Sequence, residues 1–351
     1  NAIERFLRDT CEAFATAARM LTAVGTKSFY YHSVEIYGRP ASVTADRRTT
    51  NLDLARHFTD VVDGLAAGAG AMPSPADELS LSAEDVVLLL TRKFERFFAG
   101  TPIKVEIVDG IAAKAVAGFE GVRVKRGARF APRDVAQLEY HEGHVHVATA
   151  INGRAQPLMP FVGYPSPRTT ATQEGLAVLT EFMTQSTSVE RLRRLSDRTL
   201  AIKMAEDGAD FCELYRFFRE RGNDEMSAFD GARRVCRGGL CTGGAPFTKD
   251  VCYLDGLLRV TNFLRVALVK GHLGDVPLFF AGKIAVEDVP LFGRLLREGL
   301  VKAPSYLPEW ARDLSYLTAF MSYSAFLGEC DLEAERRRYE DLMTRAEGEL
   351  G

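Results

Sequence analysis

Three of the six histidines in the protein fall within six residues, in the stretch Gln137-Leu-Glu-Tyr-His-Glu-Gly-His-Val-His146. They are His141, His144 and His146, and Glu142 directly follows the first of them. On an otherwise apolar helix, two imidazoles can hold a zinc ion while a neighbouring glutamate takes up and returns protons. These residue types, so close together, predict a zinc site with hydrolytic chemistry.

The spacing leaves two choices open for the second histidine ligand. His141 and His146 stand one residue further apart than the histidines of the common His-Glu-x-x-His pattern. In a regular helix, residues five apart lie about 140° apart around the axis, so their imidazoles cannot reach one ion. His144 lies three residues after His141 and needs no distortion. A local π-bulge, which absorbs one extra residue, would instead bring His146 onto the same face as His141.

Glu174 is the candidate third ligand, in the stretch Thr170-Ala-Thr-Gln-Glu-Gly-Leu-Ala177. Thr170 and Gln173 have the spacing of a capping box, and an apolar stripe follows them, so the stretch predicts the start of a helix. Glu174 would lie in the first turn. The helix dipole favours an acidic residue there in any case, so its position alone does not distinguish a ligand from an ordinary surface acid.

These motifs together resemble those of the QEGLA-motif proteins, a family whose animal members include the microtubule-associated tyrosine carboxypeptidases. The resemblance is carried by His141-Glu142-x-x-x-His146 and by Gln173-Glu-Gly-Leu-Ala177 further along the chain. Two more stretches agree with it, Tyr37-Gly-Arg-Pro40 and Gly243-Gly-Ala-Pro-Phe-Thr-Lys-Asp-Val-Cys-Tyr253. The match therefore spans most of the chain.

The resemblance implies a zinc ion held by His141, His146 and Glu174, with Glu142 as the catalytic carboxylate. It thus favours His146 over His144, which a regular helix would prefer. The implied activity is that of a zinc metallopeptidase, in particular a carboxypeptidase that removes the C-terminal residue of a peptide or protein tail. The similar eukaryotic enzymes remove a C-terminal tyrosine from tubulin, and nothing in this sequence establishes that substrate.

A second cluster with possible chemistry runs from Arg233 to Tyr253. A carboxypeptidase needs a cation for the terminal carboxylate of its substrate, and the planar fork of arginine can bond both oxygens at once. The candidates for this role are Arg233, Arg234, Arg237 and Lys249. Tyr253 lies one turn after Lys249, so both can face one cleft, and its hydroxyl is a candidate donor to the developing oxyanion. A solvated basic surface is the competing interpretation.

Two other classes of function remain open. The protein could be a regulatory or binding protein that keeps the metal without turnover, although Glu142 favours catalysis because a structural zinc needs no general base. It could also be an aminopeptidase or endopeptidase on the same zinc core. Those enzymes would need an anionic amine-binding group or an open-ended cleft instead of a cationic end.

The secondary-structure signals predict an α+β protein that is mostly α-helical. Residues 104–108, 113–117 and 122–124 have the alternation of short strands joined by turns, whereas residues 28–36 form a β-branched and aromatic run that predicts a strand or extended segment. A small, mostly antiparallel sheet just before the histidine helix is the arrangement that zinc peptidases use, and its edge strand could pair with an extended substrate. A structural sheet that only covers the helix fits these residues equally well. Together with the resemblance, we expect a gluzincin-like metallopeptidase core. After Glu174 the chain is predicted to be almost entirely helical, with breaks near Gly208, Gly222, Gly238 and Gly271.

The glycine- and proline-rich connector at 67–80 suggests a division of the chain. One interpretation has an N-terminal helix and strand region at 1–80 and a catalytic core with a helical C-terminal part at 81–351. The alternative is one continuous domain over 1–351.

Composition excludes several partners. The chain has 351 residues, 46% of them hydrophobic and 26% charged, with a net charge of −3, so it has no general attraction to nucleic acid. No apolar run approaches the roughly 20 residues that a membrane-spanning helix needs. The start lacks a signal-peptide pattern, and because it is not Met we expect the native N-terminus to lie upstream. Six scattered cysteines without a Cys-x-x-Cys pair predict reduced thiols in a cytoplasmic protein.

Overall fold

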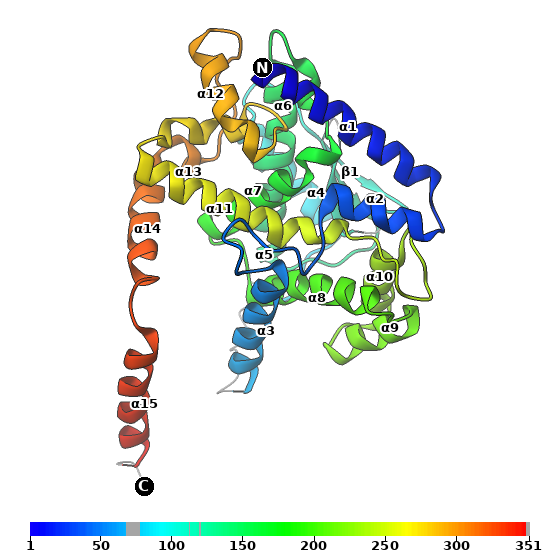
Figure 1. Ribbon diagram of the computed structural model, residues 1–351, viewed down its shortest axis with the longest axis vertical. Helices are drawn as coiled ribbons and strands as arrows, with labels where there is room; N and C mark the ends of the chain where they lie inside the picture. Colours follow the sequence, from blue (N-terminus) through cyan, green and yellow to red (C-terminus); the bar gives the residue numbers. More distant parts are fainter. Residues whose placement is uncertain (68–77, 112, 119–120, 349–351) are drawn as a thin grey trace.

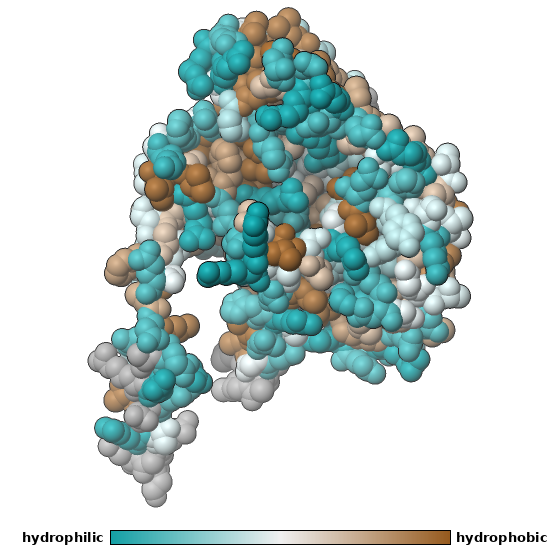
Figure 2. Space-filling view, in the orientation of Figure 1, coloured by the Kyte–Doolittle hydropathy of each residue, from teal (hydrophilic) through white to brown (hydrophobic). Residues whose placement is uncertain are grey.

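The computed structural model describes residues 1–67, 78–111, 113–118 and 121–348. Within these ranges the chain is mostly helical with one small sheet, which confirms the α+β class (Figure 1). None of the described helices is both long and apolar enough to cross a membrane. On the face shown in Figure 2, hydrophilic residues predominate and apolar residues are scattered in small groups.

Three helices begin the chain: α1 (Ala2–Thr22), α2 (Lys27–Tyr37) and α3 (Asn51–Ala67). The prediction of a strand at 28–36 is wrong, because this segment is helix α2. Phe29 and Ser33, four residues apart, form its buried face, and the Ser33 hydroxyl lies 2.8 Å from that of Thr248. Burial at helical spacing thus outweighs the β propensity of the aromatic residues.

The sheet follows helix α4 (Ala83–Phe97), which starts at a capping box of Ser82 with Asp85, a spacing that is also visible in the sequence. Its strands are β1 (Lys104–Val108), β2 (Ala115–Ala117) and β3 (Gly121–Lys125), in the order β1-β3-β2. The strand positions agree with the prediction, but the sheet is mixed and not mostly antiparallel. Because β3 turns back from β2, it runs in the direction of β1 and pairs with it in parallel.

The histidine segment is one continuous helix made of three parts: α5 (Pro132–Leu138), the π-helix η2 (Glu139–Val147) and α6 (Ala148–Arg154). Short 3₁₀ turns η3 (Pro160–Gly163) and η4 (Pro167–Thr169) lead to α7 (Thr170–Met183), the helix that carries Glu174. Helices α7 and α11 (Cys252–Lys270) lie at the centre of the largest apolar cluster, with fully buried Leu176, Leu254 and Phe279 among its members.

The remaining described elements are α8 (Val189–Glu206), α9 (Phe211–Glu220), α10 (Glu225–Cys236), η5 (Lys249–Val251), η6 (Leu273–Phe280), η7 (Val286–Asp288), α12 (Val289–Arg297), α13 (Glu309–Arg312), α14 (Leu314–Leu327) and α15 (Leu332–Gly348). The predicted breaks are confirmed, because Gly208, Gly222, Gly238 and Gly271 all follow helix ends with positive φ. Figure 1 shows α15 reaching away from the rest of the chain. Most of the predicted connector, residues 68–77, lies outside the described residues.

Candidate metal centre and its cleft

The predicted π-bulge is confirmed as a π-helix over Glu139–Val147. Its hydrogen bonds reach five residues back, as from the N–H of Ala148 to the carbonyl of Gly143. Residues five apart therefore share a face, and the rings of His141 and His146 lie 5.0 Å apart between centroids. The extra residue between the histidines thus fits the wider helix.

A glycine lets this wide helix lie against α4. A Cβ at Gly143 would stand 2.2 Å from the ring of Phe94, a residue that is itself buried in the apolar cluster of the sheet. Any larger residue at this position would force the π-helix away from α4. Gly143, which directly follows Glu142 in the histidine motif, therefore has a packing role.

A second glycine places Glu174. Helices α7 and α11 cross so closely that a Cβ at Gly175 would lie 2.0 Å from the backbone of Gly256. Glu174 stands in the second turn of α7, because the residue before the helix is Thr169. The predicted first-turn position and the capping box of Thr170 with Gln173 are wrong: a 3₁₀ turn comes first and Gln173 bonds elsewhere. The helix dipole, which acts in the first turn, therefore does not account for Glu174.

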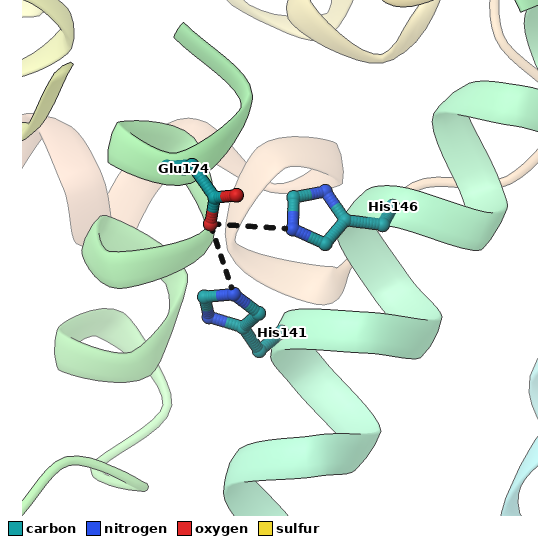
Figure 3. Close-up of side chains that lie close together, drawn as sticks. All are labelled: His141, His146 and Glu174. Carbon is teal, nitrogen blue, oxygen red and sulfur yellow. Dashed lines mark ion pairs between the residues drawn. The ribbon is translucent and has the colours of Figure 1, made fainter. Parts of the chain in front are cut away.

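The side chains of His141, His146 and Glu174 converge on one point (Figure 3). Their ligand atoms all lie within 4.8 Å of one another. Oε2 of Glu174 is 3.4 Å from Nε2 of His141 and 3.6 Å from Nε2 of His146. Tetrahedral zinc with bonds of about 2.0–2.2 Å separates its ligands by about 3.3–3.5 Å. Oε2 is buried and has no hydrogen-bond partner among the described residues, so the donor set fits zinc.

Glu181 fixes the ring of His141. Its fully buried carboxylate lies 2.7 Å from Nδ1 of His141. The other nitrogen, Nε2, therefore faces Glu174 and His146, which together with His141 form the candidate ligand cluster. Burial alone would lower the pKa of His141, but the carboxylates of Glu174 and Glu181 raise that pKa to about 10. The cluster thus carries enough negative charge to favour a cation between its members.

Arg191 balances the charge of Glu181, with hydrogen bonds of 3.0 and 2.9 Å to its two oxygens. Burial would raise the pKa of Glu181, and Arg191 together with His141 lowers it to about 2. We expect Glu181→Gln to reduce the free energy of unfolding of the metal-free protein by about 3–5 kcal/mol, because it leaves a buried guanidinium without its counter-charge. Urea unfolding at pH 7 measures this loss.

Glu190→Gln is the control, because Glu190 is exposed in the first turn of α8 and a change there should stay within about 0.5 kcal/mol. A Glu181→Gln protein as stable as the Glu190→Gln protein would contradict the assigned role of the pair.

Glu142 lines the same cleft as His141, His146 and Glu174. Its Oε2 accepts a 2.6 Å hydrogen bond from the backbone N–H of Ala117 in β2. β2 is an edge strand, and the ladder bonds at Lys114 and Gly118 show that in this register the N–H of Ala117 points away from β3. The sheet therefore orients one oxygen of the carboxylate and leaves the other available.

His144 points away from the ligand cluster. Its buried ring stacks on Phe97 with centroids 3.6 Å apart, and burial lowers its pKa to about 3. The preference for His144 assumed a regular helix, and this helix is not regular.

The ligand cluster lines a cleft of about 1320 Å³. Of the predicted substrate-binding residues, Arg234, Arg237 and Lys249 line it, as does Tyr253, the candidate donor to the oxyanion. Arg233 does not: it is exposed and pairs with Asp230 at 2.7 Å.

The cations that line the cleft differ in whether a nearby carboxylate neutralises their charge. Arg234 makes hydrogen bonds of 2.8 and 2.7 Å to the two oxygens of Asp250. Arg237 lies over the ring of Phe247, and neither it nor Lys249 forms an ion pair with any described residue. Arg237 and Lys249 therefore carry charge that an anionic ligand could neutralise.

Sequence reasoning missed the contribution of α8. Arg191, Arg194 and Arg198 line the cleft, and the guanidinium groups of the first and last lie 5.7 and 5.5 Å from the centre of the Tyr253 ring. Their spacing of three and four residues places them on one helix face, a signal that the sequence contains. Lys283 also lines the cleft, and nothing in the sequence around it indicates that place.

Comparison with known proteins agrees with the motifs. A family profile described as "Microtubule-associated tyrosine carboxypeptidase" matches residues 1–329. The chain belongs to this family. A mouse member, "Putative tyrosine carboxypeptidase MATCAP2", is 26% identical over 185 residues, which are 52% of this chain and 34% of the relative. The matched region thus spans about a third of the length of that relative.

Proposed function

We propose that this member of the family is a zinc-dependent carboxypeptidase with a gluzincin-like core. The observation that carries the proposal is the convergence of His141, His146 and Glu174 in one cleft that Glu142 also faces. When bound there, zinc supplies a Lewis acid for the scissile carbonyl and for water.

Glu142 is the general base and acid of the proposed reaction. The oxygen that Ala117 does not bind takes the proton of the attacking water and then gives it to the departing amine. Burial raises the pKa of Tyr253, so its phenol stays protonated at neutral pH. A protonated phenol can donate a hydrogen bond to the oxyanion that develops on the substrate.

The cations set the direction of attack. The terminal carboxylate of a peptide would bind at Arg237 and Lys249, where charge is not neutralised by the protein, and its last peptide bond would lie at the metal. Arg194 on α8 lines the same cleft and has no ion-pair partner among the described residues, so it can add to the attraction. A cationic end of this kind would distinguish a carboxypeptidase from an endopeptidase.

The test compares peptides with free and amidated C-termini, including peptides that end in tyrosine. Amidation removes the charge and leaves the scissile bond unchanged. We expect kcat/KM to fall about 30-fold to several-thousand-fold on amidation, which corresponds to about 2–5 kcal/mol for a lost charge pair. Acetylation of the N-terminus should have little effect.

Substitutions connect this discrimination to the residues. Arg237→Ala and Lys249→Ala should reduce the preference for the free carboxylate, whereas Arg233→Ala should retain it, because Arg233 lies outside the cleft. Equal cleavage of both peptides would indicate an endopeptidase on the same zinc core, and sensitivity to acetylation alone would indicate an aminopeptidase. Stoichiometric zinc without cleavage of any peptide would indicate a regulatory metal-binding protein.

The proposed compartment is the cytoplasm. The basis is the sequence, whose six scattered cysteines without a Cys-x-x-Cys pair are typical of reduced thiols.

A further inference from the structure

Lys283 contacts both elements that carry the proposed ligands. Its Nζ lies 3.0 Å from the backbone oxygen of His146, 3.2 Å from Oε1 of Gln173 and 3.4 Å from Oγ1 of Thr149. It comes from the chain between η6 and η7, outside both helices. The ammonium group of Lys283 thus links the backbone of His146 to the side chain of Gln173, the residue directly before Glu174.

We propose that Lys283 is a positioning residue of the proposed metal site, which fixes His146 and Glu174 relative to each other. This inference rests on the proposed zinc site. It concerns how the site is kept in shape and assigns Lys283 no contact with the substrate.

The contact to His146 lies where the helix changes its hydrogen-bonding pattern. The π-helix ends at Val147 and α6 begins at Ala148, so the carbonyl of His146 lies at the junction of the two registers. Helices distort at such junctions, where side chains can insert into the hydrogen-bond ladder. The hydroxyl of Thr149 also lies close, at 2.7 Å from the oxygen of Val145 and 3.2 Å from that of His146. A charge-assisted hydrogen bond from Lys283 adds roughly twice the strength of a neutral one.

The contact to Gln173 fixes α7 on the other side. Oε1 of Gln173 accepts hydrogen bonds from Lys283 and, at 2.9 Å, from Thr149. The opposite end of the amide, Nε2, is buried and has no hydrogen-bond partner in the described part of the chain. These two contacts therefore determine the orientation of Gln173, and through the helix backbone they restrain the adjacent Glu174.

Geometry favours positioning over a direct catalytic role. An ammonium group has three donors, and three acceptors surround this one within 3.4 Å. No donor remains for a substrate carbonyl. The backbone of Lys283 is held as well, since its N–H donates to the oxygen of Val162.

The test measures zinc affinity in Lys283→Met by competition with a chromogenic chelator. Methionine keeps an unbranched apolar side chain and has no donor. We expect binding about 10–100-fold weaker than in the wild type, the usual cost of losing a residue that supports a metal ligand. Removing a positive charge near a cation would by itself strengthen binding. A weakened site therefore reports lost positioning and not altered charge.

Three further variants complete the design. Lys283→Arg keeps the charge and donors and should recover part of the affinity. Lys270→Met, at an exposed lysine at the end of α11, should bind zinc like the wild type. Gln173→Met should weaken binding about 10-fold, and its effect should not add to that of Lys283→Met, because both remove the same contact. If Lys283→Met does not fold, Gln173→Met and Lys283→Arg provide the same comparison.

Affinity that is unchanged or higher in Lys283→Met would overturn the inference. So would a lower melting temperature of the metal-free protein with unaltered affinity, since that result indicates a role in folding alone. A wild-type protein that binds no zinc would overturn the proposed function itself, and this inference with it. Normal zinc binding by the wild type and by Lys283→Met would overturn this inference only.

Discussion

Glu142→Gln is expected to lose hydrolysis while it keeps zinc. Glutamine has nearly the same shape, and its amide oxygen can still accept the hydrogen bond from the N–H of Ala117. It cannot take a proton from water. General acid–base catalysis contributes about 10²–10⁴-fold, so kcat on a peptide with a free C-terminus should fall by a factor in that range. The measurement pairs this rate with the zinc content of the same preparation.

Zinc content decides how a loss of activity is interpreted. Glu142 lies beside the ligand cluster but is not part of it. An inactive Glu142→Gln protein that had also lost its zinc would show that the carboxylate supports the metal and would remove the argument for a general base. Activity within about tenfold of the wild type would remove Glu142 from the mechanism, given the size of the effect that acid–base catalysis usually has.

Local signals account for the parts of the fold that the sequence predicted. Ser82 and Asp85 form a capping box within four residues, and glycines such as Gly271 end helices through their own backbone conformation. The errors fall where partners distant in sequence decide. Helix α2 forms because Phe29 and Ser33 are buried against other elements. The sheet is mixed because β3 pairs antiparallel with β2 and also pairs, in parallel, with the more distant β1.

The residues of the site also differ in whether local sequence or distant packing determines their place. The spacing of His141 and His146 required a π-helix as soon as both were taken as ligands, and the structure contains one. Glu181 could also have been found, because it follows Glu174 by seven residues and so lies on the same helix face. Lys283 could not be found this way, since its place depends on how the chain after η6 packs against both ligand helices.

Tertiary packing also decides which of the predicted cations line the cleft. Arg233 and Arg234 are neighbours in sequence and equally basic. Arg233 is exposed and pairs with Asp230, whereas Arg234 lines the cleft and pairs with Asp250. The direction of a side chain on α10 is set by the helix's contacts with α8 and α9, which no short motif encodes.

His146→Ala and His144→Ala form a matched pair for the metal site itself. Both residues belong to the π-helix, but only His146 faces Glu174. We expect His146→Ala to weaken zinc binding by well over about 100-fold, because losing a ligand costs more than losing a residue that supports one. His144→Ala should leave zinc affinity within a few-fold of the wild type. Equilibrium competition with a chelator at pH 7 measures both.

The ring of His144 gives this comparison its control. It stacks on Phe97, and neither ring nitrogen has a hydrogen-bond partner among the described residues. His144→Ala should therefore alter stability through lost packing and not through metal binding, and its metal-free form should show the same change in melting temperature as its zinc-bound form. His146→Ala should instead lose the stabilisation that zinc gives to the folded state. The opposite pattern, with zinc lost in His144→Ala and kept in His146→Ala, would mean that the metal is bound at regular helical spacing, since His141 and His144 would then have to share it.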